Sequence, residues 1–294
     1  MGVLWKKLLL AALLSLGTVA ALADDASCRI CHQPTASGGI THRAHGLGAD
    51  PRGEQAAVAC TSCHGPSAAH VGGPVNHPPD VVFKKDGVFE HGEKTTGDAT
   101  CLSCHSGSAM GHWAFSEHSG AGVGCAGCHS IHTITDPVQE RDGQFQVCTD
   151  CHQREKMDQM KFSRHPLAEG LVQCTDCHAP HGGAAMNGLA QPTLNDTCYQ
   201  CHAEKRGPFL FEHEPVQDDC THCHLPHASV NDHLLKARQP FLCQQCHIAS
   251  RHPGTLYDSA TLTQRDINIV GQSCSNCHSQ VHGGNQPASS TFRR

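Results

Sequence analysis

Apolar residues form one long run, at residues 8–22, and no other segment is apolar enough over a sufficient length to cross a membrane. Lys6 and Lys7 precede this run, and Ala21 and Ala23 end it in an A-x-A pattern just before Asp24. A spanning helix needs about 20 apolar residues. The pattern therefore favours a cleaved signal peptide over residues 1–23 rather than a membrane anchor, and predicts export of residues 24–294.

Beyond residue 23, neither helical nor strand periodicity is sustained. The chain has 16 prolines and 29 glycines, and they interrupt most segments. Residues 148–162 are the best helical candidate, because they are rich in good helix formers. We expect a few short α-helices, almost no β-structure and mostly loops.

The exported chain has too little aliphatic surface for an ordinary core. Only 43 of the 271 residues from Asp24 onward are Val, Ile, Leu or Phe, which is close to the composition of disordered chains. Apolar cofactors must supply the missing core. Without Lys6 and Lys7, 19 basic residues stand against 27 acidic ones, a net charge of −8. This balance argues against nucleic-acid binding, which needs a basic face.

All 20 cysteines belong to Cys-x-x-Cys-His units. This unit is the attachment signal of c-type haem, in which two thiols bond to the porphyrin and the adjacent histidine reaches the iron. A disulfide scaffold or a zinc ribbon would also use many cysteines, but neither explains a histidine after all ten pairs. We predict ten covalent haems, attached at Cys28, Cys31, Cys60, Cys63, Cys101, Cys104, Cys125, Cys128, Cys148, Cys151, Cys174, Cys177, Cys198, Cys201, Cys220, Cys223, Cys243, Cys246, Cys274 and Cys277. The predicted proximal iron ligands are His32, His64, His105, His129, His152, His178, His202, His224, His247 and His278.

Ten of the 26 histidines are predicted proximal ligands, which leaves sixteen. A haem iron that only carries electrons needs a sixth ligand, and these histidines could supply it. Successive pairs of haem sites define five two-haem repeats over residues 24–294. In each repeat, the second site has one spare histidine upstream and one downstream. These ten are the predicted distal ligands: His45, His70, His118, His132, His165, His181, His213, His227, His252 and His282. Which of them meets which iron stays open. The other six histidines lie outside the repeat and are not predicted ligands: His42, His77, His91, His112, His222 and His233. Of these six, His42 is the least secure exclusion, because it lies three residues from His45.

Three segments carry a family resemblance: residues 195–208 (NDTCYQCHAEKRGP), 229–247 (SVNDHLLKARQPFLCQQCH) and 273–284 (SCSNCHSQVHGG). The chain resembles the periplasmic decahaem cytochromes of the MtrA/DmsE/PioA type over essentially all of residues 24–294. All ten haem sites fall in register, and the resemblance implies the same ten distal histidines. Only residues 24–27 precede Cys28, whereas some relatives carry a longer arm there, so a partner contact made by such an arm is in doubt.

The resemblance implies an electron-transfer protein without catalytic residues, working as a conduit. Such proteins sit partly inside an outer-membrane porin-like β-barrel. They link periplasmic or inner-membrane cytochromes to an extracellular multihaem cytochrome or a terminal reductase. We therefore expect an elongated haem wire in the periplasm, held at the outer membrane by a barrel partner. Its role would be extracellular metal or sulfoxide reduction, or Fe(II) oxidation.

Two other functions are compatible with many haems. One is a soluble periplasmic electron shuttle or store. The other is a multihaem nitrite- or hydroxylamine-type oxidoreductase, which would need an iron with an open coordination site. All ten units end in histidine and spare histidines outnumber irons, which disfavours an enzyme. The direction of electron flow is not encoded in these patterns.

Overall fold

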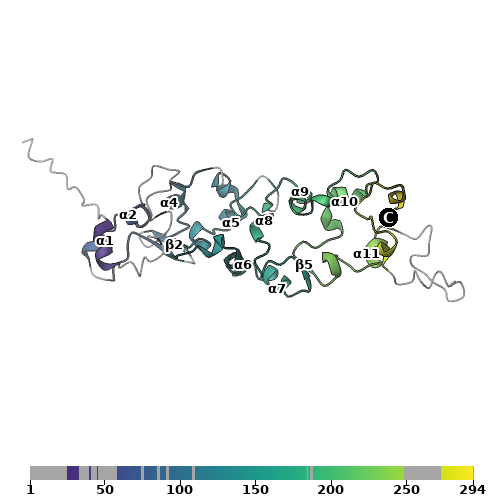
Figure 1. Ribbon diagram of the computed structural model, residues 1–294. Coiled ribbons are helices and arrows are strands. Elements are labelled where there is room, and N and C mark those ends of the chain that lie inside the picture. Colours follow the sequence, from purple (N-terminus) through teal and green to yellow (C-terminus); the bar gives the residue numbers. More distant parts are fainter. Residues whose placement is uncertain are drawn as a thin grey trace, which may run out of the picture. The chain divides into compact units, whose positions relative to one another are not determined.

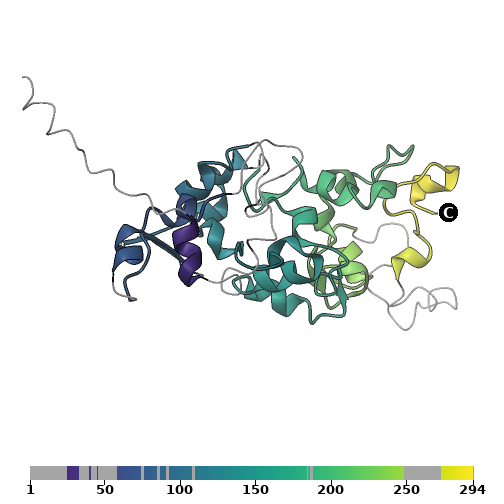
Figure 2. The ribbon, with the colours of Figure 1, turned by 60° about the vertical axis from the view of Figure 1, so that its left-hand side comes forward.

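The computed structural model describes residues 25–32, 40, 45, 58–73, 76–84, 87–90, 93–107, 110–183, 185, 188–247 and 273–293. The predicted signal peptide and His42, His91 and His252 lie outside these residues. Short helices joined by long loops make up most of the described chain (Figures 1 and 2). This is the architecture expected for a multihaem cytochrome c.

The α-helices of the described residues are four to nine residues long. They are α1 (Asp25–Cys31), α2 (Cys60–His64), α3 (Ala68–Gly72), α4 (Asp98–Leu102), α5 (Glu117–Gly120), α6 (Arg141–Thr149), α7 (Gln153–Asp158), α8 (Cys174–Cys177), α9 (Leu194–Tyr199), α10 (Glu214–Asp218) and α11 (Phe241–Gln244). Single turns of 3₁₀ helix lie at Trp113–Phe115, Cys125–Gly127, Pro137–Gln139, Ala203–Lys205, Cys220–His222, Asp232–Leu234, Cys274–Asn276 and Pro287–Thr291.

The helix predicted over residues 148–162 differs from the observed one. Helix α6 begins earlier, at Arg141, and ends at Thr149, and α7 is a separate helix. His152 lies between them with φ −82° and ψ 66°, which is outside the helical region. The haem-binding turn at residues 148–152 therefore separates α6 from α7. Helix propensity alone does not predict this break.

The described β-structure consists of two small antiparallel sheets. Strands β1 (Val81–Lys84), β2 (Gly87–Glu90) and β3 (Glu93–Thr95) follow one another in the order β1-β2-β3, with Val82 opposite Phe89. Strands β4 (Ser163–Arg164) and β5 (Ala228–Ser229) form the second sheet. Val88 is 1% exposed. It packs against Gly97 at φ +68°, where a Cβ would lie 2.4 Å from the valine side chain, so this contact requires glycine.

The chain divides into two compact units. The first comprises Met1–Ser106 with Gly122–Asp136, and the second comprises Gly107–Ala121 with Pro137–Arg294. Each unit is thus assembled from two separate stretches of sequence. The short stretch in the second unit carries His118, and the short stretch in the first carries His132.

The protein part of the core is very small. Among the described residues, only four hydrophobic side chains are buried: Val88, Trp113, Phe145 and Ala228. Larger apolar side chains such as Phe115 and Met160 are 89% and 81% exposed. This agrees with the composition, which predicts that cofactors supply most of the apolar core. Within the described residues, no helix has the length and apolarity needed to cross a membrane.

Candidate haem-binding sites

Each Cys-x-x-Cys-His unit forms one helical turn. In nine units the histidine backbone N–H donates to the carbonyl of the first cysteine, with N···O distances of 2.9–3.1 Å, and helix α2 contains the tenth unit. Side chains at positions i, i+3 and i+4 of a helix share one face. Both thiols and the imidazole of a unit are therefore presented to the same side. All 20 cysteines are free of disulfide bonds, as haem attachment requires.

Eight pairs of histidine rings have centroids 5.8–6.4 Å apart. Every pair joins one predicted proximal ligand to one predicted distal ligand. The pairs are His32 with His70, His105 with His45, His64 with His132, His152 with His118, His202 with His165, His178 with His227, His247 with His213 and His224 with His282.

The separation of the rings fits a metal ion between them. A metal–imidazole nitrogen bond is about 2.0–2.1 Å long and the ring centre lies about 1.1 Å beyond the nitrogen, so two trans imidazoles have centres about 6.3 Å apart. The eight observed separations lie within half an ångström of this value. In the pair His45–His105, the two Nε2 atoms lie 3.5 Å apart, about half an ångström less than two metal–nitrogen bonds would span. The donor set and its spacing therefore suit bis-histidine haem.

The pairs follow one register along the repeats. The upstream spare histidine of one repeat meets the first-site histidine of the next in His45–His105, His118–His152, His165–His202 and His213–His247. The downstream spare histidine meets the second-site histidine of the preceding repeat in His132–His64, His227–His178 and His282–His224. Only His32–His70 lies within a single repeat. Successive repeats are therefore interlocked.

The Nδ1 atoms of three upstream spare histidines reinforce this register. His118, His165 and His213 place Nδ1 at 3.1, 2.7 and 3.0 Å from the carbonyl oxygens of Pro180, Pro226 and Val281, respectively. Each carbonyl belongs to the residue just before the downstream spare histidine of the next repeat. A carbonyl oxygen only accepts, so Nδ1 carries the proton and Nε2 keeps its lone pair for a metal.

Several proximal histidines are oriented in the same way. Nδ1 of His64, His224 and His278 donates to the backbone carbonyls of Val81, His233 and Thr291, at 2.9, 2.8 and 2.6 Å. His129 differs, because its Nδ1 lies 2.7 Å from a carboxylate oxygen of Asp136. All four contacts fix the ring and leave Nε2 available for a metal.

Burial keeps several of these imidazoles neutral. It lowers the pKa of His132, His213 and His224, and it lowers the pKa of His282 to about 4. Neighbouring histidines add to the effect, because a second positive charge nearby is unfavourable. The neutral imidazole is the form that binds a metal ion.

The thiols of the two sites in a repeat lie side by side. A hydrogen bond from Cys125 lowers the pKa of the Cys101 thiol to about 7, and one from Cys148 does the same for Cys174. In the fourth repeat, a hydrogen bond with Cys198 lowers the pKa of the Cys220 thiol. In the fifth repeat, burial and the nearby Cys274 raise the pKa of the Cys243 thiol to about 11.

Cysteines of successive repeats are also neighbours. Burial raises the pKa of Cys63, and the nearby Cys101 thiol adds to the shift. Burial likewise raises the pKa of Cys177 and Cys223, which face Cys198 and Cys246 of the following repeats. Within each of the two compact units, neighbouring haem attachment sites thus follow their order in the sequence.

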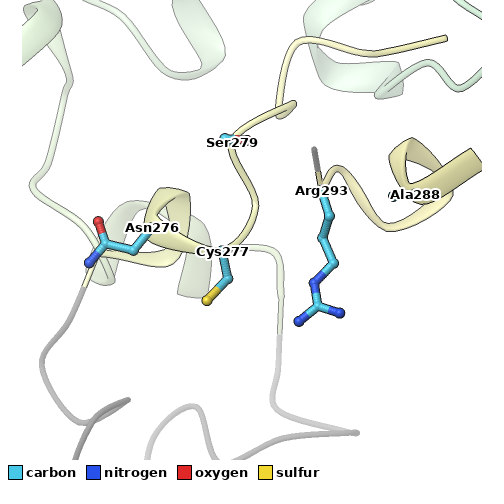
Figure 3. A pocket seen from close by; sticks show the side chains of 5 residues that line it. All are labelled: Asn276, Cys277, Ser279, Ala288 and Arg293. Carbon is cyan, nitrogen blue, oxygen red and sulfur yellow. The ribbon is translucent and has the colours of Figure 1, made fainter. Parts of the chain in front are cut away.

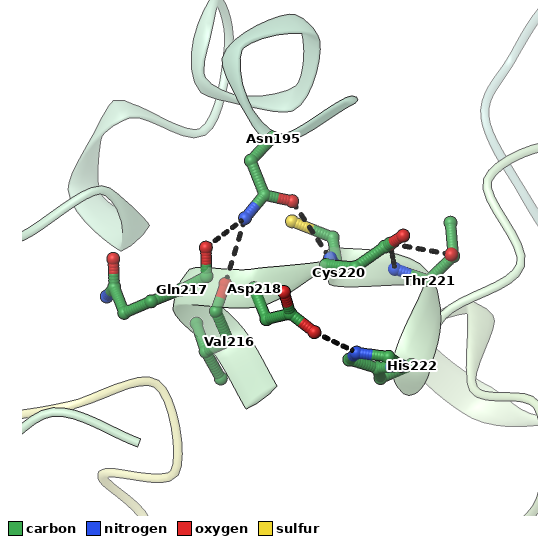
Figure 4. A network of polar contacts seen from close by, with 8 residues as sticks. Asn195, Val216, Gln217, Asp218, Cys220, Thr221 and His222 are labelled. Carbon is green, nitrogen blue, oxygen red and sulfur yellow. Dashed lines mark hydrogen bonds and ion pairs between the residues drawn. The ribbon is translucent and has the colours of Figure 1, made fainter. Parts of the chain in front are cut away.

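One polar side chain bridges the two sites of a repeat in four of the five repeats. Asn195, which is 8% exposed, accepts from the backbone N–H of Cys220 at 2.9 Å (Figure 4). Its amide nitrogen donates to the carbonyls of Val216 and Gln217, both at 3.1 Å. The bridge therefore connects α9, at the start of the repeat's first site, to the chain that leads into its second site.

The equivalent bridges use Asp98, Gln144 and Gln239. They accept from the backbone N–H of Cys125, Thr175 and Ser275, at 3.0, 3.1 and 3.0 Å. Asp98 and Asn195 lie three positions before the first cysteine of their repeat, and each accepts from the first cysteine of the second site. Gln144 and Gln239 lie four positions before the first cysteine of their repeat. Each of these two accepts from the residue that follows the first cysteine of the second site. We call Asp98, Gln144, Asn195 and Gln239 the bridge residues. Sequence reasoning missed them, although a polar residue at this offset is visible in the sequence.

Other described polar groups also fit a bound cofactor. Both amide atoms of Gln159 and Nε of Arg164 are buried without a protein partner, although buried polar atoms normally have one. At the tenth site, Cys277 and Arg293 line a hollow of about 540 Å³ (Figure 3), within the about 300–1,000 Å³ typical of cofactor sites. The Arg164 guanidinium already pairs with Glu169, and its Nε could donate to a haem carboxylate.

The structure places the remaining predicted residues as follows. His181 has its ring centroid 6.1 Å from that of Trp113, and His252 lies outside the described residues. Of the histidines predicted not to be ligands, His222 pairs with Asp218 at 2.7 Å, and His77 has Nδ1 3.0 Å from the Pro78 carbonyl. None of the eight ring pairs includes a histidine from this group.

Known proteins share these motifs. The family profile described as "Doubled CXXCH motif" matches residues 118–157, 165–207 and 213–252. The multiheme cytochrome MtrA of Shewanella baltica (strain OS185) is 40% identical over 273 residues, which is 91% of this chain and 80% of that protein. The cytochrome c-type protein NrfB of Escherichia coli O6:H1 is 33% identical over 133 residues, 44% of this chain and 65% of its own. The C-type polyheme cytochrome OmcB of Geobacter sulfurreducens is 26% identical over 163 residues, 47% of this chain and 21% of its own.

Proposed function

Because the chain belongs to the family of the multihaem cytochrome MtrA, we propose that it is a decahaem electron conduit with two histidines at every iron. Covalent haem c and electron transfer follow from the family and from the doubled attachment motif. The observation that carries the further step is the set of eight ring pairs, each with one proximal and one distal histidine. Haem c supplies the one-electron couple, and the protein supplies its position, ligands and surroundings.

The ligand assignment follows the register of the repeats. In each of the eight observed pairs, the two histidines would hold the same haem iron. The other two distal candidates, His181 and His252, stay proposed ligands without an assigned iron. The attachment residues are the 20 cysteines of the ten units.

The residues around the rings have a positioning role. Backbone carbonyls hold Nδ1 of ligands such as His165 and His213, so that each ring can turn little about its Cα–Cβ bond. Burial keeps His132 and His282 neutral. An iron held by two such imidazoles would have no ligand position left for a substrate. This favours electron transfer over a nitrite- or hydroxylamine-type reaction.

The sequence order of the cysteines supports a wire. Cys101 contacts Cys125 within a repeat, and Cys63 faces Cys101 across a junction between repeats. The same alternation recurs from Cys177 to Cys198 and from Cys198 to Cys220. Within each of the two compact units, we therefore place neighbouring haems in the order of their attachment sites.

The proposed location is the periplasm, with the wire reaching the cell exterior through an outer-membrane porin-like β-barrel. The predicted signal peptide supports export, and the relationship to MtrA supports the conduit role. Electron exchange would occur with periplasmic or inner-membrane cytochromes at one end. An extracellular multihaem cytochrome or a terminal reductase would serve the other end. A soluble periplasmic shuttle is the alternative function.

Reconstitution in liposomes tests the conduit. The holoprotein and its candidate barrel are incorporated together, an azo or viologen redox dye is enclosed, and dithionite is added outside. We expect the enclosed dye to change redox state only when both proteins are present. The same rate with the barrel alone would contradict the conduit. A cytochrome that exchanges electrons with soluble cytochromes but never associates with the barrel would favour the shuttle.

A further inference from the structure

A buried carboxylate distinguishes the fourth haem site from other sites of the chain. Asp136 is 1% exposed. Its Oδ2 lies 2.7 Å from Nδ1 of His129, and its Oδ1 accepts from the backbone N–H of Ser130 at 3.0 Å. Thr133 closes the same loop by donating to the Ser130 carbonyl at 2.8 Å. One carboxylate oxygen of Asp136 thus contacts the imidazole, while the hydrogen bond from Ser130 to the other oxygen holds the carboxylate in place.

We propose that Asp136 is a positioning residue that lowers the reduction potential of the haem attached at Cys125 and Cys128. The inference rests on the proposed role of His129 as an axial ligand. A carboxylate that accepts the Nδ1 proton makes the imidazole a stronger electron donor to a metal. A stronger donor and a nearby buried negative charge both favour ferric over ferrous iron, because the ferric form carries one more positive charge.

Other proximal histidines provide the contrast. His64, His224 and His278 donate to backbone carbonyls, which carry no net charge. His152 and His202 each have a glutamate oxygen 3.9 Å away, which is beyond hydrogen-bond distance. Those two imidazoles are 57% and 55% exposed, so water screens the glutamate charges. Asp136 combines short distance, burial and charge.

A lower potential at one site changes how a series of haems fills with electrons. When the protein is partly reduced, the fourth haem stays oxidised longer than a haem whose proximal histidine donates to a backbone carbonyl. Asp136 therefore influences which haems hold the electrons of a partly reduced chain.

Replacement of the carboxylate tests the proposal on the holoprotein. Asp136→Asn keeps the size of the side chain and an oxygen acceptor for Nδ1, and Asp136→Ser also removes the charge. In a spectroelectrochemical titration, we expect one haem in ten to shift to a more positive potential in either variant that carries ten haems. The low-spin spectrum should not change. Asp136→Glu, which keeps the charge, should titrate as the unmodified protein does.

Two controls separate the possible outcomes. Glu155→Gln removes a carboxylate that is 33% exposed and 3.9 Å from His152, and it should leave the titration unchanged. Titrations of both neutral Asp136 variants that coincide with the unmodified protein would overturn the inference, as would a shift spread over all ten haems. If replacing His129 by methionine leaves every haem spectrum unchanged, the ligand assignment itself fails. That result is distinct from failure of the aspartate proposal.

Discussion

Asn195→Ala should loosen the connection between the two haem sites of the fourth repeat. The side chain makes three hydrogen bonds from a buried position, one to the N–H of Cys220 and two to the carbonyls of Val216 and Gln217. A hydrogen bond contributes about 0.5–1.5 kcal/mol, and a buried group left unpaired costs about 1–3 kcal/mol. Alanine offers no partner for these groups. We expect the segment around Cys220 to lose about 2–4 kcal/mol of local stability.

Hydrogen exchange of the holoprotein measures this loss at the correct place. Local opening exposes the Cys220 amide, and its exchange rate reports the free energy of that opening. A loss of about 2 kcal/mol raises the exchange rate about 30-fold, since about 1.4 kcal/mol is a factor of ten. Deuterium uptake should rise in peptides that contain residues 214–222. It should stay unchanged around the equivalent segment of the third repeat.

Two variants make the test specific. The N–H of Thr175 donates to Gln144 at 3.1 Å. Gln144→Ala should therefore speed hydrogen exchange at Thr175 and leave exchange at Cys220 unchanged. Asn276→Ala changes an exposed asparagine in another haem-binding turn and should alter neither segment. If exchange at Cys220 is the same in Asn195→Ala and in the unmodified protein, the bridge residues do not connect the sites as described.

Two further predictions concern ligands and folding. His165→Met should convert one haem to histidine–methionine ligation and raise its potential, whereas His222→Gln should leave the low-spin spectrum unchanged; a high-spin signal in the His222 variant alone would reverse the assignment. Haem-free protein made in the cytoplasm should be disordered, because so few apolar side chains are buried, and a cooperative thermal transition by circular dichroism would contradict this.

The sequence predicted the local parts of the sites and left their connections open. Cysteine and histidine spacing alone predicts the haem-binding turns, and the structure has such a turn at each unit. One ring of each of the eight pairs is a spare histidine that the repeat singles out, and its role as a distal ligand stays a prediction. Which ring meets which, as in His64 with His132, depends on how one repeat packs against the next. That information is not contained within any single repeat.

Other features were missed for related reasons. The helix expected over residues 148–162 is divided at His152, because the haem-binding turn overrides helix propensity. The sheet β1-β2-β3 was not expected, although Val81, Val82 and Phe83 and then Val88 and Phe89 are residues that favour strands. Asp136 resembles any loop aspartate in the sequence, and its importance depends on burial and on a 2.7 Å contact.

The register of the ring pairs has a consequence for how the protein is made. Synthesis delivers His45 before His105, so the haem at the first site of the second repeat finds its distal histidine already present. His64 must instead wait for His132, which emerges dozens of residues later, and His178 waits in the same way for His227. On the proposed pairing, second-site histidines such as His64 and His178 would share an iron with a histidine that is made later. A first-site histidine of a later repeat, such as His105, would share one with a histidine made earlier. Completion of the sites would therefore alternate along the growing chain.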